Sequence, residues 1–453
     1  MKNLTLFLFF LLSSLSSFSQ YIEGRVFDAI TKKPIEGVHV YMEGINRGTL
    51  TNEKGTYFLK FPHTIVKSDV IHFTHIAYKP IEVPYLQNKK SYSVYLFSDL
   101  KKLEEVKIAQ RRNLKKSISY KKLSSMKKGL YSFGSLLKED KIYVIGGDAS
   151  YLTNGHKQTL QELENNLEVD NIYKFLTKAK TNYFTQFYKK DILIYDIKLN
   201  KWEKKENLNF RKRAYHNLNL YNNKIYILGG KRLSISKKYE YLDDKIEVFD
   251  LDTENIFTDN TNPHQAVDFA SFTYKDNIIV MGGSIKMKRN GFKEYSNKVH
   301  LYNLKVGKWY LLGNMPVAKE VNGVLIENKI YLIGGTNRKP FSSIETFDLV
   351  TQKWKKEGSL FYGIAKPAVT HSNHIIYFYD DGKITTYNIN TKELNEYLID
   401  LNLKRSELYY SNNKLYLLGG IKKNDYSYKP SGDLFSIDIS DFDKTKIHNS
   451  KTL

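Results

Sequence analysis

The chain has 453 residues with 41% hydrophobic and 14% aromatic content, enough for two or three domains with a sizeable core. It contains no cysteine, which excludes disulfides, thiolate metal sites and a cysteine nucleophile. The formal net charge is +22, and the lysines are spread along the chain rather than gathered in one block. We therefore expect a weak, salt-sensitive attraction to anionic partners, and no nucleic-acid partner because no nucleic-acid motif is present.

The N-terminus has the three parts of a secretory signal peptide. Lys2 supplies the positive start, residues 4–12 form a short apolar run, and residues 17–19 read Ser-Phe-Ser, a small-x-small cleavage site. This predicts a signal peptide over 1–19 and an exported protein, periplasmic or extracellular. Because the chain has no cysteine, we do not expect a lipoprotein. No second long apolar run follows the signal peptide, so no transmembrane segment is predicted.

Residues 20–98 alternate apolar and polar side chains, with turn signals every eight to twelve residues, which is typical of a small β-sandwich. The segment resembles the carboxypeptidase regulatory-like domain, a transthyretin-type β-sandwich. The resemblance is carried by Gly24, Val26, Asp28, Thr31, Pro34, Ile35, Gly37, Val38, Val40, Gly48, Thr49, Thr51, Asn52, Gly55 and Tyr57. It implies an accessory module of exported envelope proteins, without peptidase activity. A basic linker is expected over 99–128.

Two patterns repeat over residues 129–448 at a period of roughly 40 to 50 residues. In the first, a short apolar run ends in a glycine pair; these pairs are Gly146-Gly147, Gly229-Gly230, Gly282-Gly283, Gly334-Gly335 and Gly419-Gly420. In the second, a large apolar residue follows an aromatic by seven positions; three copies end in tryptophan, namely Trp202, Trp309 and Trp354. Both patterns occur six times, although Asp380-Asp381 replaces the glycines in the fifth copy.

These repeats resemble the kelch motif, in which each repeat forms one four-stranded blade of a β-propeller. The resemblance implies an all-β chain with a six-bladed propeller over 129–448. Glycine pairs suit places where neighbouring blades crowd together, and the tryptophans should fill the space between blades. We expect the fifth blade to be the least regular. Either residues 444–448 or a strand near Val106 could close the ring, and the sequence leaves both possible.

The first blade carries an insertion over 148–190, in which Leu160, Leu163, Leu167, Phe175 and Leu176 have approximate helical spacing. Two interpretations remain open. The helix could pack on its own blade, or it could serve as a lid or docking arm.

The loops at one mouth of the propeller are rich in cations, which predicts an anion-binding site. Candidate ligand-binding residues are Arg211, Arg213, Arg232, Arg289, Arg338 and Arg405. Lysines such as Lys286 and Lys288 should join them. No catalytic or metal-ligand spacing stands out, so we expect no catalytic residues, no metal and no cofactor. Galactose oxidase shares the kelch propeller, but its cofactor needs a cysteine that this chain lacks.

The favoured interpretation is a non-enzymatic binding or scaffold protein of the bacterial cell envelope, whose partner is an envelope protein or an acidic glycan. The alternative is a sugar-binding enzyme. Exported six-bladed kelch proteins include sialic acid mutarotases, and Arg213, Arg232, Arg338, Arg405 and Glu407 could serve such a role.

Overall fold

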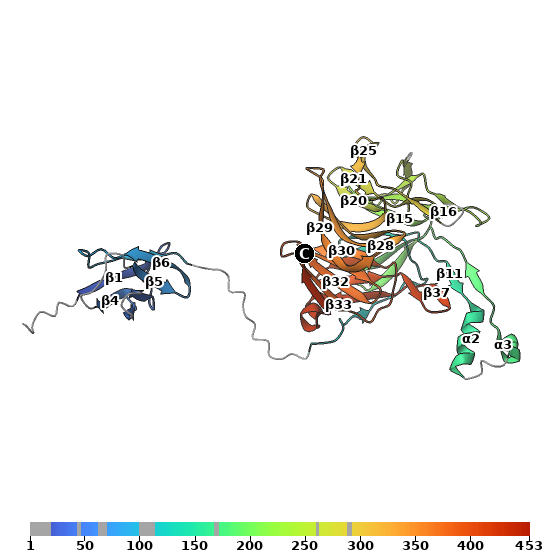
Figure 1. Cartoon of the computed structure of the whole chain (residues 1–453). Helices are drawn as coiled ribbons and strands as arrows, with labels where there is room; N and C mark the ends of the chain where they lie inside the picture. Colours follow the sequence, from blue (N-terminus) through green and yellow to red (C-terminus); the bar gives the residue numbers. More distant parts are fainter. Residues whose placement is uncertain are drawn as a thin grey trace, which may run out of the picture. The chain divides into compact units, whose positions relative to one another are not determined.

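The computed structural model describes residues 20–42, 47–61, 70–98, 114–166, 172–259, 262–287 and 292–453. The chain divides into two compact units, residues 1–111 (unit 1) and 112–453 (unit 2), as drawn in Figure 1. The predicted signal peptide and the first half of the predicted linker lie outside the described residues. In the described ranges, no helix has the length and apolar character needed to cross a bilayer.

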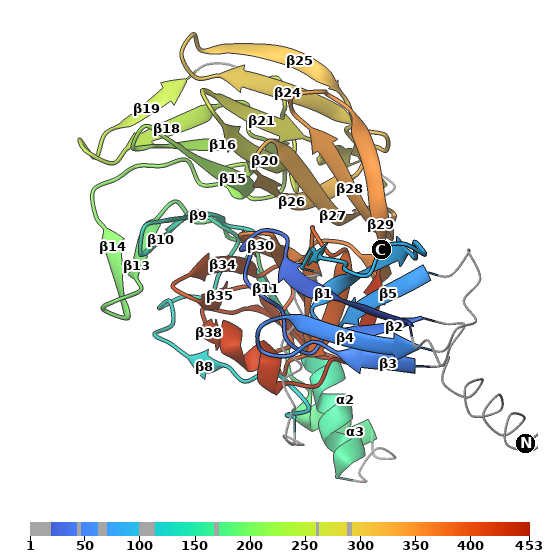
Figure 2. The ribbon, with the colours of Figure 1, turned by 90° about the vertical axis from the view of Figure 1, so that its left-hand side faces the viewer.

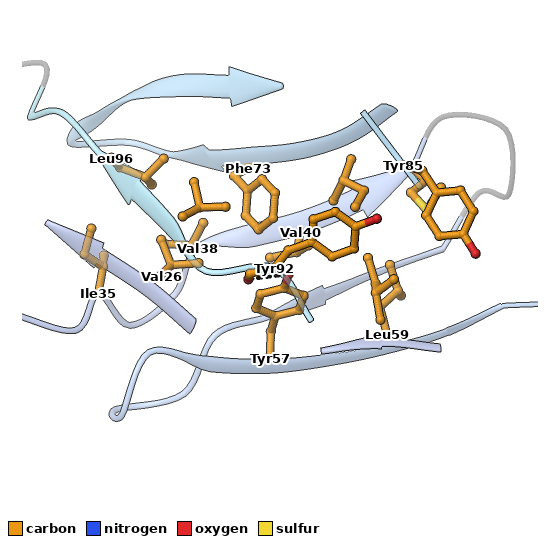
Figure 3. Packing of buried hydrophobic residues seen from close by; sticks show 14 of the residues in the cluster. Val26, Ile35, Val38, Val40, Tyr57, Leu59, Phe73, Tyr85, Tyr92 and Leu96 are labelled. Carbon is orange, nitrogen blue, oxygen red and sulfur yellow. Dashed lines mark hydrogen bonds between the residues drawn. The ribbon is translucent and has the colours of Figure 1, made fainter. Parts of the chain in front are cut away.

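Unit 1 is a β-sandwich of two sheets, with strand orders β4–β1–β7 and β3–β2–β5–β6. Its strands are β1 Gln20–Asp28, β2 His39–Met42, β3 Arg47–Leu50, β4 Thr56–Phe61, β5 Val70–His75, β6 Tyr78–Pro84 and β7 Val94–Leu96. Alternate residues of β2, β4 and β5 are buried in the core, so Val40 is buried while its neighbour His39 is exposed. Figure 3 shows this core, where the Tyr57 hydroxyl donates to the Tyr92 carbonyl at 3.0 Å. The predicted small sandwich is confirmed.

Unit 2 is a propeller of six antiparallel blades, seen as a ring in Figure 2. Blade one consists of β9 Gly134–Lys138, β10 Lys141–Ile145, β13 Ile192–Asp196 and β14 Lys201–Lys205. Blade two consists of β15 Ala214–Tyr221, β16 Lys224–Leu233, β18 Ile246–Asp250 and β19 Ile256–Asp259. Blade three consists of β20 Ala270–Tyr274, β21 Asn277–Met281, β24 Lys298–Asn303 and β25 Lys308–Asn314. The predicted six-bladed, all-β architecture is confirmed for this unit.

The remaining three blades complete the ring. Blade four consists of β26 Glu320–Ile326, β27 Lys329–Asn337, β28 Lys339–Asp348 and β29 Trp354–Ile364. Blade five consists of β30 Ala368–Ser372, β31 Ile375–Asp380, β32 Lys383–Asn388, β33 Glu393–Leu398 and β39 Asn449–Thr452. Blade six consists of β34 Glu407–Ser411, β35 Lys414–Leu418, β38 Leu434–Asp438 and β8 Lys121–Lys122. The inner strands are β9, β15, β20, β26, β30 and β34, which surround the axis; in blades one to five the inner strand is also the first along the chain, whereas blade six begins with its outer strand β8.

The tryptophans lie on the outer strands and pack between blades. Trp202 faces Tyr195 across its ladder, with ring centres 5.1 Å apart, and joins a core cluster shared by blades one and six. Trp309 and Trp354 make the same cross-strand contacts with Tyr302 and Phe347, at 4.8 and 4.7 Å. All three rings are half-buried, so their outer edges remain exposed.

The ring is closed by a segment that the sequence assigned to the linker. Lys121 and Lys122 form β8 and pair with β38 as the outer strand of blade six. Of the two closing segments that the sequence left possible, residues 444–448 do not form this strand, because they lie between the end of the 3₁₀ helix η2 (Ile439–Lys444) and β39, and Val106 lies outside the described residues. The C-terminal strand β39 instead adds a fifth strand to blade five. The linker boundary at residue 128 is therefore too late, and the propeller boundary at 448 is too early.

Blade five is regular, contrary to expectation. Its four main strands pair without a register shift, whereas blades three and four contain shifts. Asp381 and Gly382 take positive φ values of 40° and 86° and make a tight turn between β31 and β32. Gly382 supplies the backbone freedom that a glycine pair provides elsewhere, so the ladder is undisturbed.

Further strands and two helices extend from the loop face of the ring. They are β11 Tyr151–Thr153, α2 Gly155–Asn165, α3 Ile172–Lys178, β12 Tyr183–Thr185, β17 Glu240–Leu242, β22 Ser284–Met287, β23 Lys293–Tyr295, β36 Ile421–Lys423 and β37 Ser427–Pro430. The predicted insertion forms an arm in which α2 contacts α3 and β11 pairs with β37. Figure 1 shows both helices projecting away from the blades. This arrangement does not support packing of the helices on blade one.

Candidate functional site

Six equivalent positions lie at the mouth of the propeller, where the inner strands begin. In each blade, one inner-strand residue pairs with the last residue before the glycine pair, or before Asp380 in blade five. This pairing gives the blades a common register. Two residues earlier in each blade lie the members of what we call the mouth ring: Ser132, Tyr215, Asp268, Glu320, Lys366 and Arg405.

An ion-pair cluster spans the axis within this ring. Asp268 of blade three accepts hydrogen bonds from both terminal nitrogens of Arg405 of blade six, at 3.1 to 3.2 Å. Those blades are opposite one another in a six-bladed ring. Lys366 of blade five pairs with the same carboxylate, and Arg405 also donates to the Ser132 hydroxyl at 3.2 Å. Side chains from four blades therefore meet at one point.

The electrostatics of the cluster keep Asp268 ionised. Its side chain is only 2% exposed, and burial alone would raise its pKa. The charges of Arg405 and Lys366 outweigh burial and hold the pKa of Asp268 well below its usual range. Burial likewise opposes the charge of Arg405, but Asp268 raises the pKa of the guanidinium above its ordinary value. The axis thus carries a permanent charge cluster across the neutral pH range.

Tyrosines form one wall of the mouth. The ring of Tyr215 lies beneath two cations, with Lys231 Nζ 4.4 Å and the Arg405 guanidinium carbon 5.3 Å from its centre. The Tyr215 hydroxyl donates to Asp148 at 3.1 Å. Tyr131 and Tyr188 pack edge-on against it. Burial raises the pKa of all three hydroxyls, so they remain neutral hydrogen-bonding groups.

The mouth ring is built on strained backbone. Four of its six members have left-handed φ values although none is glycine: Ser132 45°, Tyr215 64°, Asp268 53° and Arg405 57°. Non-glycine residues rarely adopt this conformation, and it persists only where the surrounding structure enforces it. Its recurrence at equivalent positions indicates a site whose side chains are aimed by the fold.

A cavity of about 620 Å³ opens beside the cluster. Its lining includes Tyr215, Asp268 and Arg405 of the mouth ring together with residues from the loops of blades two and three. Two lining lysines are neutralised, since Lys231 pairs with Glu240 at 2.8 Å and Lys293 pairs with Glu320. Of the other three cations of the lining, Arg405 pairs with Asp268, whereas Arg232 and Lys286 form no ion pair within the described part of the chain.

Glu407 lies two residues beyond Arg405, at the start of β34, and its carboxyl group is partly exposed. Burial raises its pKa to about 7; the charge of Lys366 opposes this shift, and that of Asp268 adds to it. Among described residues, none donates a hydrogen bond to this carboxyl group. Glu407 is therefore a free carboxyl group that can gain or lose a proton near neutral pH.

The structure separates the arginines that the sequence grouped at the mouth. Arg213 is 0% exposed and lies inside blade two, where it pairs with Glu247 at 2.7 Å and Asp243 at 3.5 Å. Arg211 pairs with the same Asp243 at 3.1 Å. Arg213 cannot reach a ligand at the mouth, and the charge of Arg211 is largely neutralised by the buried carboxylate of Asp243.

The other predicted arginines differ in position. Arg405 belongs to the mouth ring, and Arg232 lines the cavity with its guanidinium 5.9 Å from the Tyr241 ring centre. Arg338 stacks on Phe292 at 5.0 Å and is absent from the cavity lining. Arg289 lies outside the described residues. The predicted ring of cations is thus corrected to a mouth of mixed charge, with Asp268, Glu240 and Glu320 against the cations.

Sequence reasoning missed five members of the mouth ring. They are a serine, a tyrosine, two acids and a lysine, so no shared residue type marks them. The available signal was their register, because each lies at a fixed distance before a recognisable inner strand. Counting back from the glycine pairs would have found them.

Comparison with known proteins agrees with this architecture. Residues 184–385 match the KLHDC2/KLHL20/DRC7 Kelch-repeats domain. Unit 2 carries a kelch-repeat domain. Residues 22–108 match the CarboxypepD_reg-like domain, which covers the sandwich of unit 1. The predicted pairing of an N-terminal carboxypeptidase regulatory-like domain with kelch repeats is confirmed at this level.

Relatives of the kelch propeller are distant. Kelch-like protein 15 of Homo sapiens is 28% identical over 182 residues, covering 36% of this chain and 29% of that protein. A RING finger domain and kelch repeat-containing protein of Dictyostelium discoideum is 27% identical over 128 residues, covering 28% and 12%. The chain therefore spans less than a third of these relatives. A solved structure titled "Structure of YjhT" superimposes with a TM-score of 0.50 at 11% identity, over 68% of this chain and 95% of that one, which shows the shared fold.

Proposed function

We propose that this protein is an exported, non-enzymatic binding protein of the bacterial cell envelope whose kelch propeller binds an acidic glycan at its mouth. The observation that carries the proposal is the cavity beside the mouth ring. It combines a tyrosine face, a fixed Asp–Arg pair and two cations, Arg232 and Lys286, that have no carboxylate partner among the residues the structure describes. Aromatic faces stack on sugar rings, and fixed polar groups orient their hydroxyls.

The charge arrangement favours a ligand with one or two carboxylates over a strongly polyanionic one. Lys231 and Lys293 are already neutralised by Glu240 and Glu320. Among the described residues of the lining, Arg232 and Lys286 remain to meet a negative group, and the guanidinium of Arg232 can bind a carboxylate with two parallel hydrogen bonds. An acidic sugar therefore fits the cavity better than an uncharged one.

The test is calorimetric titration of the full chain with matched acidic and neutral sugars, such as glucuronate and glucose oligomers. We expect the acidic series to bind and the double variant Arg232→Ala/Lys286→Ala to lose at least tenfold in affinity. A control variant, Lys201→Ala/Lys353→Ala, removes the same charge from exposed positions on β14 and the β28–β29 turn. Equal loss in both variants, or equal binding of neutral sugars, would contradict the proposal.

A second candidate is an enzyme similar to the sialic acid mutarotases, and Glu407 is the observation that favours it. Exchange of a sugar between its two anomers requires a group that both accepts and donates a proton, and a carboxyl group with a pKa of about 7 can do both. NMR of a freshly dissolved single anomer would detect faster exchange. If catalysis occurs, Glu407→Gln should abolish it while leaving sugar affinity within twofold.

A further inference from the structure

A cluster of lysines surrounds one aromatic ring outside the mouth cavity. Phe187 lies between β12 and β13, where its amide donates to the Ser150 hydroxyl at 3.0 Å and its carbonyl accepts from the Ala149 amide at 2.9 Å. These bonds fix the backbone that carries the half-buried ring. Phe187 is thus a fixed apolar surface at the edge of the loop face.

Three ammonium groups from three separate segments gather around this ring. Their Nζ atoms lie 4.6 Å (Lys189), 5.3 Å (Lys237) and 5.8 Å (Lys212) from the ring centre. Lys189 precedes β13, Lys212 lies in the loop before β15, and Lys237 lies in the turn between β16 and β17. Segments distant in sequence therefore place like charges close together.

Within the described part of the chain, Lys128, Lys189, Lys212 and Lys237 form no ion pair, although the charge of Asp191 favours the ammonium form of Lys189. The nearby acid Asp191 is engaged by Lys204 at 3.3 Å. Burial lowers the pKa of Lys189, and the charge of Lys128 lowers it further. Burial and the charge of Lys128 thus disfavour the ammonium form of Lys189, and a bound anion would favour it.

We propose that Phe187, Lys189, Lys212 and Lys237 form a second binding site, selective for a phosphate or sulfate group. Separate ammonium groups act as point charges that can each meet a different oxygen of a tetrahedral anion. A planar carboxylate offers only two oxygens and is better matched by a guanidinium, which this cluster lacks. The site uses none of the residues that carry the proposed glycan site, so either proposal can fail alone.

The test titrates the full chain at low salt with inorganic phosphate and sulfate, and separately with glucose 6-phosphate and glucose 6-sulfate. Glucuronate serves as the carboxylate comparison. Binding is followed by NMR of ¹³C-methylated lysines, in which the pKa of Lys189 should rise when the anion binds. Tighter binding of the esters identifies an esterified ligand, and equal binding identifies the free ion; either result supports the site.

Charge-matched variants separate this site from general electrostatic attraction. Lys189→Gln/Lys212→Gln/Lys237→Gln should weaken phosphate and sulfate binding at least tenfold. The control Lys201→Gln/Lys353→Gln/Lys414→Gln has the same net charge and should bind within twofold of the unmodified protein. The proposal is overturned if neither anion shifts the NMR signals of Lys189, Lys212 and Lys237, if both variants lose affinity equally, or if glucuronate shifts those signals at concentrations as low as the phosphate ester does.

Discussion

Replacing Asp268 with Asn tests the ion-pair cluster at the propeller axis. The change keeps the side-chain volume but leaves Arg405 and Lys366 without their common carboxylate. Removing one partner of a buried ion pair costs about 3–5 kcal/mol. Because the side chains of Arg405 and Lys366 are still 26% and 23% exposed, water offsets part of that cost. We expect the free energy of unfolding of unit 2 to fall by about 2–3 kcal/mol at pH 7.

The pH dependence provides an independent check on the same cluster. The pKa of Asp268 is lower in the folded protein than in the unfolded chain, where it is about 3.9. Its contribution to stability is therefore fully present above that pH and is lost as the pH falls through the folded pKa. The Asn variant lacks this contribution. The difference between the two proteins should be constant near neutral pH and shrink below about pH 4.

Tryptophan fluorescence during urea unfolding is a suitable assay, since all 3 tryptophans of the chain lie in the propeller. The matched control is Asp381→Asn. Asp381 pairs with Lys404 at 3.0 Å, but the two side chains are 40% and 53% exposed, so its loss should cost less than about 1 kcal/mol. If Asp268→Asn is no more destabilising than this control, the cluster does not stabilise the propeller.

Three further predictions concern single positions. Glu407→Gln should be more stable than the unmodified protein by about 3 kcal/mol at pH 8 and equal to it at pH 4, because the pKa of Glu407 is raised to about 7 and its ionisation opposes folding. Urea unfolding at both pH values checks this. Burial lowers the pKa of His264 to about 4. The free energy of unfolding should therefore fall by about 3 kcal/mol as the pH falls from 6.5 to 4. In His264→Gln the same quantity should fall less steeply over this pH range. Gly334→Ala should lower the free energy of unfolding by more than about 2 kcal/mol, because φ is 61° and a Cβ would lie 2.4 Å from a backbone carbonyl oxygen. The control Gly307→Ala, with φ 63° and its nearest atom at 3.9 Å, should lower it by about 1 kcal/mol. Equal shifts in melting temperature would show that the close contact at Gly334 does not add to the cost.

The blades were predictable because their turns use local chemistry. In five of its six copies, the second repeat pattern has Asp or Asn just after the aromatic, and those side chains cap the turn that follows. Asp348 accepts from the amides of Val350 and Thr351 at 2.9 and 2.8 Å, and Asn388 caps its turn in the same way. Such bonds need only a few neighbouring residues, so the sequence alone contains the information.

The charge of the mouth could not be predicted because pairing is a long-range property. Arg213 meets Glu247, which is 34 residues later, and Arg405 meets Asp268 across the ring, 137 residues earlier. Counting arginines in the loops of the sequence finds the cations but does not show which acids neutralise them in the folded protein. The closing strand was hidden for a similar reason, since β8 has 2 residues, both lysine, and offers no apolar pattern.

The repeat and the site are connected through the glycine pairs. The amide of Gly283 donates to the Lys319 carbonyl of the next blade at 2.8 Å, and Gly420 donates to Leu130 at 3.0 Å. Each acceptor lies one or two residues before a member of the mouth ring, so the bond fixes the loop that aims that member. Because these contacts use backbone atoms, the repeat constrains the path of the loop and leaves the ring residue free to vary. This explains how six similar blades present six different side chains at the mouth, and why the strained conformations there survive: each loop is held by its neighbour rather than by its own sequence.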